Sequence, residues 1–474
     1  MAHEIVSELT DLLGADAVLS GSAEVLAYDS DAYTLEKAAP LCTALPSSTG
    51  QVAQVVAACN KQGVAYAPRG AGTGKAGGTL LPGGVLIGSA RMNRVLSVDL
   101  RNRRMTAQAG AANVTLSKAV AAHNLHYAPD PSSQGVSTLG GNIANNAGGP
   151  HTLKYGVTAN HLLGLTVVLP SAQVVTLGDC TEEMPGYDLL GLFCGAEGTL
   201  GMVTEAVVRL TPLPESVRTL LAVFPTVEGA TRTVGEIMNA GITPAALELM
   251  DAVILQAVEA AFHFGFPLDC AAILIIEIDG VEQGLDSQAG RIAEICRGNG
   301  AREVRSARSA RERADLWAAR KKAVGTLGRI KPAVVTQDGV IPRSKLPFVL
   351  ERIAAIGAKY DLRIANVFHA GDGNLHPVIV YDERDSAEVR RVIDANKEIL
   401  ELCLSVGGSL TGEHGIGVEK RDFMPELFSA ETLDLMKRLR EAINPRGLCN
   451  ADKILPTAHG CSYEIVTRRG LVGV

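Results

Sequence analysis

A glycine-rich stretch at residues 69–84, RGAGTGKAGGTLLPGG, restricts the possible folds more than any other part of this sequence. It follows VAYAP, which has the composition of a buried strand, and its glycines include a G-x-G-x-x-G spacing. A Rossmann loop must open a helix, whereas this stretch leads through Pro82 into a second strand-like run, VLIG. A Walker A loop is also excluded, because Ala76 follows Lys75 where Ser or Thr is required. Two interpretations remain, an anion cradle of backbone N–H groups or an ordinary long turn.

Two more glycine-rich stretches follow, PDPSSQGVSTLGGNIANNAGG at residues 129–149 and FCGAEGTLGMVTEAVVRL at residues 193–210. Glycine and asparagine crowd residues 140–149, where a positive φ and a close backbone approach cost little. Each stretch alone is explained by a tight loop in a β-rich domain. Three such loops in the first half of the chain are better explained by one extended ligand that all of them contact.

The composition is that of a globular α/β protein. Hydrophobic residues make up 47% and charged residues 20% of the 474 residues, so a sizeable core is expected, divided over about three domains. The 44 basic and 51 acidic residues give a net charge of −7, and no basic stripe is interleaved with aromatic residues. Nucleic acid is therefore not an expected partner.

The sequence indicates a reducing compartment and no transmembrane segment. The first residues, MAHEIVSELTDLLG, place acids and apolar residues at helical spacing and lack the basic start and the cleavage site of a signal peptide. No apolar run approaches the roughly 20 residues that cross a bilayer. The nine cysteines are scattered without a C-x-x-C pair, which argues against a self-contained iron–sulfur cluster. We expect a cytoplasmic protein that reaches the inner face of a membrane, if at all, through a partner.

Beyond residue 213 the sequence alternates strands and helices. VRTLLAVFP, AALELMD and AAILIIEIDG are separated by segments of helical periodicity, and VVTQDGVIP and IANVFHAGDGNLHPVIVYD then repeat the order. Two ferredoxin-like halves that share one sheet fit this pattern. A helical segment at residues 428–442 and a strand-poor tail close the chain.

The motif HAGDGNLHP at residues 369–377 carries two histidines around a Gly-Asp-Gly-Asn core. On one continuous strand they would face opposite sides, since their separation is odd. A four-residue hairpin loop at residues 371–374 would instead place His369 opposite His376, with their Cβ atoms about 4.5 to 5.5 Å apart. The two imidazoles could then meet.

Two neutral imidazoles on one hairpin form half of a metal site. The segment LTGEHGIGVEK offers Glu413 as a third ligand, and a His, His, Glu set leaves open positions, as catalytic metal sites do. His414 points elsewhere in an extended segment and becomes a candidate base beside the metal. This donor set suits zinc, ferrous iron or manganese. The structural alternative is a hairpin whose imidazoles lie at the surface or are hydrogen-bonded.

Five motifs in register resemble those of one flavoprotein superfamily. PRGAGTG, TLGGNIANNAGG, GAEGTLG, HAGDGNLHP and GEHGIG resemble the vanillyl-alcohol oxidase and p-cresol methylhydroxylase flavoproteins, in particular the glycolate oxidase flavin subunit and D-lactate dehydrogenase branch. The similarity covers residues 20–457. It implies an α+β fold: a two-lobed PCMH-type FAD-binding domain at residues 1–213, a ferredoxin-like substrate (cap) domain at residues 214–410, and a helical C-terminal segment at residues 411–474 that returns to the FAD domain.

The resemblance also implies which residues contact FAD. The first loop and the Gly/Asn stretch surround the pyrophosphate and the isoalloxazine ring. The implied cofactor-binding residues are Pro68, Arg69, Gly70, Ala71, Gly72, Thr73, Gly74, Pro131, Ser132, Thr138, Gly140, Gly141, Asn142, Ala144, Asn145, Gly148, Gly149, Tyr155, Gly156, Glu197, Gly198, Gly201, Val203 and Asn450. Covalent-flavin branches carry a histidine in the first loop. This loop has none, so we expect non-covalent FAD.

The resemblance gives a role to four residues of the two histidine motifs. His369, His376 and Glu413 match the metal ligands of the family, and His414 matches its catalytic histidine. These assignments agree with the metal site that the spacing of the two motifs suggests.

Three further residues bear on the substrate. Arg320, in LWAARKK, matches an arginine that binds the substrate carboxylate, although an arginine on so basic a helix is ordinarily solvated. Thr336 stands where D-2-hydroxyglutarate dehydrogenases have a lysine, so we do not expect a second carboxylate to be bound. Arg343 is the residue that could supply the missing cation.

The predicted function is oxidation of a short D-2-hydroxy acid, of the D-lactate or glycolate class, to the 2-oxo acid. The metal binds the hydroxyl and one carboxylate oxygen, His414 takes the proton, and a hydride passes from Cα to flavin N5. Reduced FAD is reoxidised by an external acceptor: a quinone, an iron–sulfur partner subunit or another carrier. A homodimer is compatible with the sequence.

Three alternatives stay open. A D-2-hydroxyglutarate-type dicarboxylate dehydrogenase would need another cation beside the second carboxylate. A non-redox transferase of the alkyl-glycerone-phosphate synthase type would need a phosphate- and acyl-binding tunnel. A non-catalytic flavin subunit would be expected to lose the metal set, yet His369, His376, Glu413 and His414 are all present.

Overall fold

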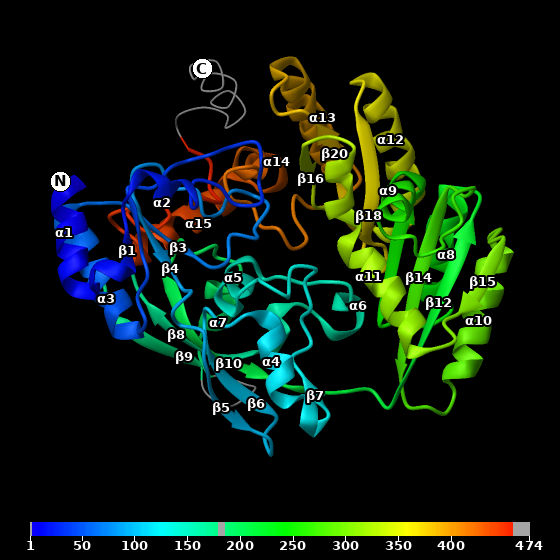
Figure 1. Ribbon diagram of the computed structural model, residues 1–474, viewed down its shortest axis with the longest axis horizontal. Helices are drawn as coiled ribbons and strands as arrows, with labels where there is room; N and C mark the ends of the chain where they lie inside the picture. Colours follow the sequence, from blue (N-terminus) through cyan, green and yellow to red (C-terminus); the bar gives the residue numbers. More distant parts are fainter. Residues whose placement is uncertain (1, 179–184, 458–474) are drawn as a thin grey trace. The chain divides into compact units, whose positions relative to one another are not determined.

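The computed structural model describes residues 2–178 and 185–457 (Figure 1). These residues form two compact units, which are described separately. The first unit contains residues 2–148, 156–178, 185–213 and 413–457. The second unit contains residues 149–155 and 214–412.

The first lobe of the first unit is a four-stranded sheet of order β1-β2-β4-β3, in which β2, β4 and β3 run parallel. Helix α3 connects β2 to β3 and buries Val52, Val55, Val56 and Cys59, which recur at helical spacing. Gly63 ends α3 in the left-handed conformation, at φ 68°. The elements of this lobe are α1 (Ala2–Leu13), β1 (Val18–Leu19), α2 (Ser22–Leu26), β2 (Cys42–Ala44), α3 (Thr49–Gln62), β3 (Tyr66–Arg69) and β4 (Val85–Gly88).

The second lobe is an antiparallel sheet of order β5-β6-β10-β8-β9. Strand β10 alternates buried and half-buried residues, the pattern of a sheet with one covered face, and α4 and α5 contribute Leu116 and Ile143 to the core beneath it. Helices α14 (Met424–Leu427) and α15 (Ala430–Ile443) of the C-terminal segment also belong to this unit. The other elements are β5 (Val95–Asp99), β6 (Arg104–Gln108), α4 (Asn113–Val120), β7 (Leu125–His126), α5 (Leu139–Asn145), β8 (Leu162–Val168), β9 (Val174–Gly178), α7 (Leu189–Phe193), β10 (Met202–Arg209) and β11 (Thr211–Pro212).

The second unit is built on one antiparallel sheet, and the first half of that sheet has the predicted ferredoxin-like order. The first half has the order β15-β12-β14-β13, which is the ferredoxin-like arrangement, with α9 as an added helix. In the second half β18, β20 and β16 are neighbours, and β18 also pairs with β19 and β19 with β17. Strands β13 and β18 join the two halves.

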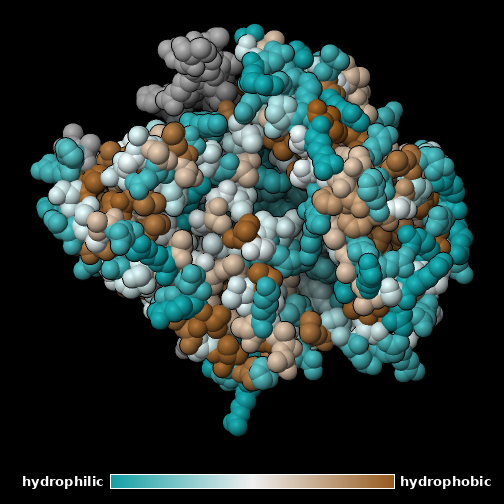
Figure 2. Space-filling model, viewed as in Figure 1, coloured by the Kyte–Doolittle hydropathy of each residue, from teal (hydrophilic) through white to brown (hydrophobic). Residues whose placement is uncertain are grey.

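Helices cover both faces of this sheet, so its strands are almost continuously apolar. Helices α9 and α11 share a core with one face, and α8, α10, α12 and α13 cover the other (Figure 1). Hydrophilic side chains lie along the outer edge formed by α10 and β15 (Figure 2). The elements are α6 (Thr152–Tyr155), β12 (Ser216–Phe224), α8 (Val227–Asn239), β13 (Ala246–Asp251), α9 (Ala252–Phe262), β14 (Ala272–Gly280), α10 (Leu285–Gly298), β15 (Glu303–Ser306), α11 (Ala310–Thr326), β16 (Ala333–Thr336), β17 (Gly339–Val340), α12 (Leu346–Lys359), β18 (Arg363–His369), β19 (Asn374–Leu375), β20 (Pro377–Tyr381) and α13 (Ser386–Ser405).

Two expectations about membranes and cysteines can be compared with these elements. No helix within residues 2–178 and 185–457 is long and apolar enough to cross a membrane. The cysteines that the structure describes, at positions 42, 59, 194, 270, 296, 403 and 449, are not joined in disulfides. Cys180 and Cys461 lie outside the described residues.

Candidate active site

Polar side chains gather at one end of the sheet face that α9 and α11 cover. Side chains alternate between faces along a strand, so residues two positions apart share a face. Glu248 therefore shares the face of Met250, and His369 shares the face of Val367, both of which belong to the core beneath α9 and α11. Because neighbouring strands are antiparallel, the start of β13 lies beside the ends of β14 and β18, at the same edge of the sheet. The polar residues at this edge are Thr219, Glu277, Glu248, His369, His376, Thr336 and Asp338.

The hairpin between β18 and β20 brings the two predicted histidines together in a register other than the predicted one. His369 pairs with Asn374, and Asn366 pairs with Pro377, so His376 lies two positions beyond the residue opposite His369. A shift of two positions keeps a side chain on the same face. The rings still meet as diagonal neighbours, edge to face, with centroids 5.1 Å apart. The predicted pairing of His369 with His376 is wrong, whereas the meeting of their rings is confirmed.

Local hydrogen bonding explains the register. Asp372 Oδ1 accepts the backbone N–H of Asn374 at 3.1 Å, and Gly373 adopts φ 80°. The turn therefore closes over residues 370–373, one position earlier than predicted. Gly373 also allows a close approach, because a Cβ there would lie 2.2 Å from the carbonyl oxygen of Ile341.

Glu248 contacts two of the predicted site residues at once. It is fully buried, its Oε2 accepts from Arg320 Nε at 2.6 Å, and its Oε1 lies 2.7 Å from His369 Nδ1. Burial alone would raise the pKa of Glu248, but the charge of Arg320 and the contact with His369 hold that pKa below its usual value. Arg320 is 3% exposed, so it is not the solvated helix charge that its basic neighbours suggest.

Asp338 is a second buried carboxylate beside the histidine pair. Its Oδ1 lies 3.4 Å from His376 Nε2. Its Oδ2 accepts from Thr411 Oγ1 at 2.5 Å and from the backbone N–H of Gly412 at 3.0 Å. The register of β16 and β20, in which Thr336 pairs with Val378, extends directly to this contact. Each histidine of the pair therefore has its own buried carboxylate neighbour.

The predicted substrate-binding residues differ in what they already bind. Arg320 Nη2 is buried and has no hydrogen-bond partner among the described residues, so it is available to a ligand. Thr336 is buried on the same face of the sheet. Arg343 Nη1 donates to the carbonyl oxygen of Gly371 at 3.0 Å, which commits this arginine to the turn that follows His369.

A third buried carboxylate on this face, Glu277, binds an arginine with both of its oxygens. Arg313 donates through Nε at 2.8 Å and through Nη2 at 2.7 Å, one bond to each oxygen. Trp317 Nε1 and Thr219 Oγ1 also donate to Glu277, at 2.7 and 2.6 Å. Burial would raise the pKa of Glu277, and these bonds and the contact with His151 hold that pKa far below its usual value.

Residues 149–155 belong to the second unit, although their neighbours on both sides belong to the first. Tyr155 Oη donates to Asp279 Oδ2 at 2.6 Å. Gly149 and Tyr155, both expected at the cofactor, thus belong to the second unit.

The three glycine-rich loops of the first unit converge. A Cβ at Gly70 would lie 2.4 Å from Thr138 Oγ1, and a Cβ at Gly198 would lie 2.3 Å from Pro68 Cγ. Thr138 also caps α5, since its Oγ1 accepts the N–H of Gly141 at 3.2 Å. The loops therefore touch where a side chain would not fit, so glycine is needed at these two positions.

Glu197 ties the GEHGIG segment to these loops. Its carboxylate accepts the backbone N–H groups of Ile416 and Gly417, at 2.6 and 2.8 Å. Burial raises the pKa of Glu197, and the two N–H groups oppose that rise. Asn145, in the Gly/Asn stretch, donates through Nδ2 to the carbonyl oxygen of His414 at 2.6 Å. The backbone of His414 is therefore fixed within the first unit.

The loop residues of the first unit fit a large polar ligand such as FAD. Ser137 Oγ and Asn450 Oδ1 are buried and have no hydrogen-bond partner within the described part of the chain, as expected where a polar ligand binds. Arg69 has a different role, because its Nη2 donates to the carbonyl oxygen of Ser30 at 2.8 Å. It also neighbours Asp31, whose pKa burial raises to about 6. Arg69 thus supports the first loop from inside the protein.

Sequence reasoning missed Glu248 and Asp338. Both acids lie within or next to apolar runs, ALELMD and VVTQDG, that were interpreted as strands. An acid in a strand that is buried on both faces is itself a signal, because a buried carboxylate needs a partner. The signal does not say which partner, since His369 is 121 positions from Glu248.

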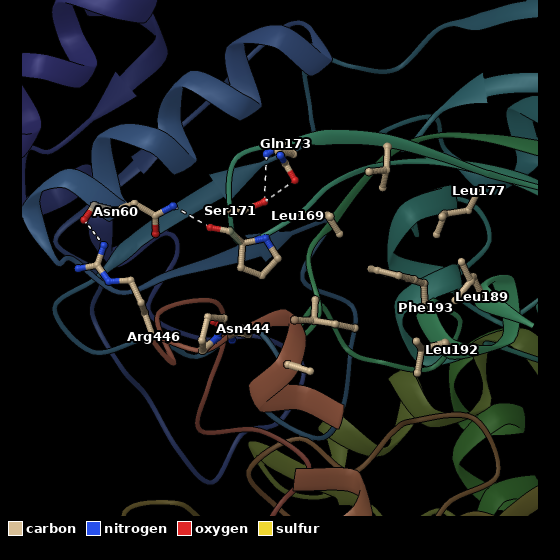
Figure 3. Close-up of a pocket in the computed structure, with 15 residues that line it drawn as sticks. Asn60, Leu169, Ser171, Gln173, Leu177, Leu189, Leu192, Phe193, Asn444 and Arg446 are labelled. Carbon is tan, nitrogen blue, oxygen red and sulfur yellow. Dashed lines mark hydrogen bonds between the residues drawn. The ribbon is translucent and has the colours of Figure 1, made fainter. Parts of the chain in front are cut away.

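A pocket of about 640 Å³ opens elsewhere on the first unit (Figure 3). Its lining residues are Asn60, Leu169, Pro170, Ser171, Gln173, Val175, Leu177, Leu189, Leu192, Phe193, Ala442, Ile443, Asn444, Pro445 and Arg446. Asn60 Nδ2 donates to the carbonyl oxygen of Pro170 at 2.7 Å, at the polar side of the pocket. The predicted site residues are not part of this lining.

Two family models match the chain. The model described as FAD binding domain matches residues 40–178, and the model described as FAD linked oxidases, C-terminal domain, matches residues 213–454. Together they span both units, including the glycine-rich loops up to residue 178 and both histidine motifs.

Curated relatives cover nearly the whole chain. The chain is 44% identical over 446 residues to the glycolate oxidase subunit GlcD of Escherichia coli (strain K12), which covers 94% of this chain and 89% of the relative. It is 31% identical over 428 residues to a D-lactate dehydrogenase of Anaerostipes hadrus, covering 88% of this chain and 90% of the relative.

Solved structures agree on the fold. p-Cresol methylhydroxylase with substrate bound superposes with a TM-score of 0.80 at 16% identity, over 94% of this chain and 95% of that chain. At this identity the similarity shows the fold alone, and it confirms the PCMH-type, α+β architecture. By the family models and the curated relatives, the chain belongs to the FAD-linked oxidases and is an FAD-dependent oxidoreductase.

Proposed function

We propose that this chain is a dehydrogenase for a short D-2-hydroxy acid of the D-lactate or glycolate class. The observation that supports this proposal most strongly is the cluster on the second unit's sheet. There a pair of histidines with rings 5.1 Å apart lies beside Arg320, a buried arginine held by Glu248. The names of the relatives, a glycolate oxidase subunit and a D-lactate dehydrogenase, support the same substrate class.

His369 and His376 would hold a divalent ion of zinc, iron or manganese, and Glu413 would complete the ligand set. Glu413 directly follows Gly412, whose N–H is bound by Asp338, the carboxylate next to His376. Imidazole and carboxylate donors suit all three metals. When bound, the ion lowers the pKa of the substrate hydroxyl and the non-covalent FAD supplies the hydride acceptor.

The remaining steps belong to residues of the chain itself. Arg320 would bind the substrate carboxylate through Nη2, because its Nε is already held by Glu248. His414 would accept the proton of the hydroxyl, and Asn145 fixes the backbone from which its side chain starts.

The site should favour one carboxylate over two. Thr336 offers a hydroxyl where a lysine would be needed for a second carboxylate, and Arg343 is bound to the turn after His369. A carboxylate without a partner in a closed site costs several kcal/mol. Monocarboxylates are therefore the proposed substrates.

Electrons would leave the protein through an external acceptor. The relative from Escherichia coli is named as a subunit, which supports a partner subunit as one form of acceptor. A quinone or another soluble carrier would serve the same chemistry. We place the protein in the cytoplasm, with any membrane contact made through such a partner.

Anaerobic reduction of the bound flavin tests the proposal without the acceptor. We expect D-lactate or glycolate to bleach the flavin with an efficiency at least about 100-fold above that of D-2-hydroxyglutarate or D-malate. Arg320→Lys should lose most of that efficiency, because a point charge cannot reproduce the planar fork. Arg311→Lys, an exposed change on the same helix α11, is the matched control and should leave the rates unchanged.

Two outcomes would overturn the substrate class. Rapid bleaching by D-2-hydroxyglutarate that is lost in Arg343→Ala would identify a dicarboxylate dehydrogenase and its second cation. No bleaching by any 2-hydroxy acid would instead favour a non-redox transferase or a non-catalytic flavin subunit.

A further inference from the structure

Glu248 lies between His369, a proposed metal ligand, and Arg320, the proposed carboxylate-binding residue. Oε1 of this residue is 2.7 Å from Nδ1 of His369, a proposed metal ligand, and Oε2 is 2.6 Å from Nε of Arg320, the proposed carboxylate-binding residue. The side chain is completely buried, and each of its two oxygens lies within hydrogen-bonding distance of one nitrogen donor. One side chain is therefore in contact with both halves of the proposed site.

The contact with Nδ1 determines which nitrogen of His369 can bind a metal. A neutral imidazole carries one N–H, and a buried carboxylate retains that proton on the nitrogen that faces it. With Nδ1–H donated to Glu248, the lone pair of His369 lies on Nε2. Carboxylate partners of this kind fix the tautomer and the orientation of metal-binding histidines.

The contact with Nε determines which part of Arg320 can bind a substrate. Arg320 uses Nε on Glu248, and its buried Nη2 has no hydrogen-bond partner among the residues that the structure describes. Arg313, on the same helix, gives both Nε and Nη2 to Glu277. Both oxygens of Glu277 accept from its arginine, whereas Glu248 accepts from Arg320 through one oxygen and faces His369 with the other. Arg313 thus shows the closed ion pair that a purely structural role would give, and Arg320 does not.

We infer that Glu248 is a positioning residue that serves both ends of the site: it holds His369 as the Nδ1–H tautomer for the metal and orients Arg320 for the substrate carboxylate. The inference rests on the proposed function, because it assumes a metal at the histidines and a carboxylate at the arginine. It adds a residue that contacts neither ligand directly, and it predicts that both ligands weaken together when this one carboxylate is changed.

Glu248→Gln is the decisive variant, since it keeps the size of the side chain but leaves one acceptor oxygen for two donors. Metal affinity is measured by titration of zinc or manganese into metal-depleted holoflavoprotein, without substrate. We expect the dissociation constant to rise about 10- to 100-fold. The Arg320 end is measured separately, as pyruvate binding to the same metal-depleted protein followed by the flavin spectrum. There we expect a loss of about 10-fold or more.

Glu388→Gln is the matched control. Glu388 is 5% exposed, belongs to the same unit and accepts from Lys331 Nζ at 2.6 Å at the start of α13, away from the histidines. The Glu388→Gln variant makes the same chemical change as Glu248→Gln, in a carboxylate that is almost as buried as Glu248. Both affinities should stay at the wild-type value in this variant.

His369→Ala separates failure of the inference from failure of the proposed function. If His369→Ala loses the metal and Glu248→Gln keeps wild-type affinity for metal and pyruvate, the role of Glu248 is refuted and the metal site stands. If His369→Ala keeps the metal, the proposed metal site is wrong, and the inference falls with it. Loss of only one ligand in Glu248→Gln would also refute the shared role.

The wild-type protein provides a test that does not depend on the variant folding. In metal-depleted protein with 15N-labelled histidine, the resonance that disappears in His369→Ala should show a protonated Nδ1 and an unprotonated Nε2. An Nε2–H tautomer would overturn the inference. This readout would be unaffected by a general loss of stability.

Discussion

At the scale of single residues, His376 offers the most direct test of the metal site. His376→Ala should abolish stoichiometric metal and turnover while the flavin spectrum persists, because the glycine-rich loops belong to the other unit. Elemental analysis and the visible spectrum of the purified protein measure the two properties. His123→Ala, at an exposed position, is the control. Full activity in a metal-free preparation would contradict the site.

His414 is expected to act as the base. His414→Asn should retain the metal and slow flavin reduction by about 100- to 10,000-fold, the usual contribution of a positioned base. The backbone bond from Asn145 does not depend on the side chain of residue 414, so the segment should keep its place. Stopped-flow reduction by the best substrate measures the rate. An unchanged rate would leave His414 an orienting role only.

The sequence predicted some of these residues and missed others for a physical reason. The histidines stand in a short motif that itself folds into the hairpin, and the structure brings their rings together. Glu248 and Asp338 act through partners on other strands, and the contact between Glu248 and His369 spans 121 positions. Such contacts depend on strand order and register, which hydrophobic periodicity does not specify.

At the scale of elements, periodicity was sufficient for most of the fold. It predicted α3, the strands on either side of the first glycine-rich loop, and the ferredoxin-like order of the first half of the second unit's sheet. The predicted hairpin register was wrong by two positions: His369 pairs with Asn374 and not with His376, because the Asp372 side chain closes the turn early. Periodicity also did not anticipate that residues 149–155 would leave the first unit. Both failures arise from side-chain bonds that no spacing rule contains.

Gly198 tests whether the contact between two glycine-rich loops is required. Gly198→Ala forces a positive φ on alanine, at 69°, and places Cβ 2.3 Å from Pro68 Cγ. Gly241→Ala also forces a positive φ on alanine, at 76°, but its Cβ would have no atom within 4 Å. The difference between the two variants therefore measures the steric effect. We expect Gly198→Ala to lose about 1–3 kcal/mol more stability than the control, and to retain less FAD. Equal thermal shifts and equal flavin content in the two variants would contradict the contact.

At the scale of the whole molecule, Lys453 should make unfolding depend on pH. It is 2% exposed and donates through Nζ to the carbonyl oxygen of Leu80 at 2.7 Å, and burial lowers its pKa from 10.5 to about 8. Between these values the unfolded chain binds a proton that the folded chain does not, so the lysine's contribution to stability rises with pH in this window.

The difference in free energy of unfolding between wild type and Lys453→Met isolates this effect. Relative to the variant, the wild type should gain up to about 3 kcal/mol from pH 8 to pH 10.5. Denaturant unfolding at several pH values measures the difference. Lys437→Met, at an exposed position of α15, should show no such slope. A flat difference for Lys453→Met would mean that the lysine titrates normally.

The chain passes between the two units at residues 148/149, 155/156, 213/214 and 412/413. A gene divided after residue 213 would therefore not yield two autonomous proteins. The leading fragment would lack the N–H groups of Ile416 and Gly417 that bind Glu197, and it would carry Tyr155 without Asp279. Each fragment would expose groups that only the other can satisfy. Such halves would behave as a split enzyme, inactive when expressed alone and reconstituted when produced together.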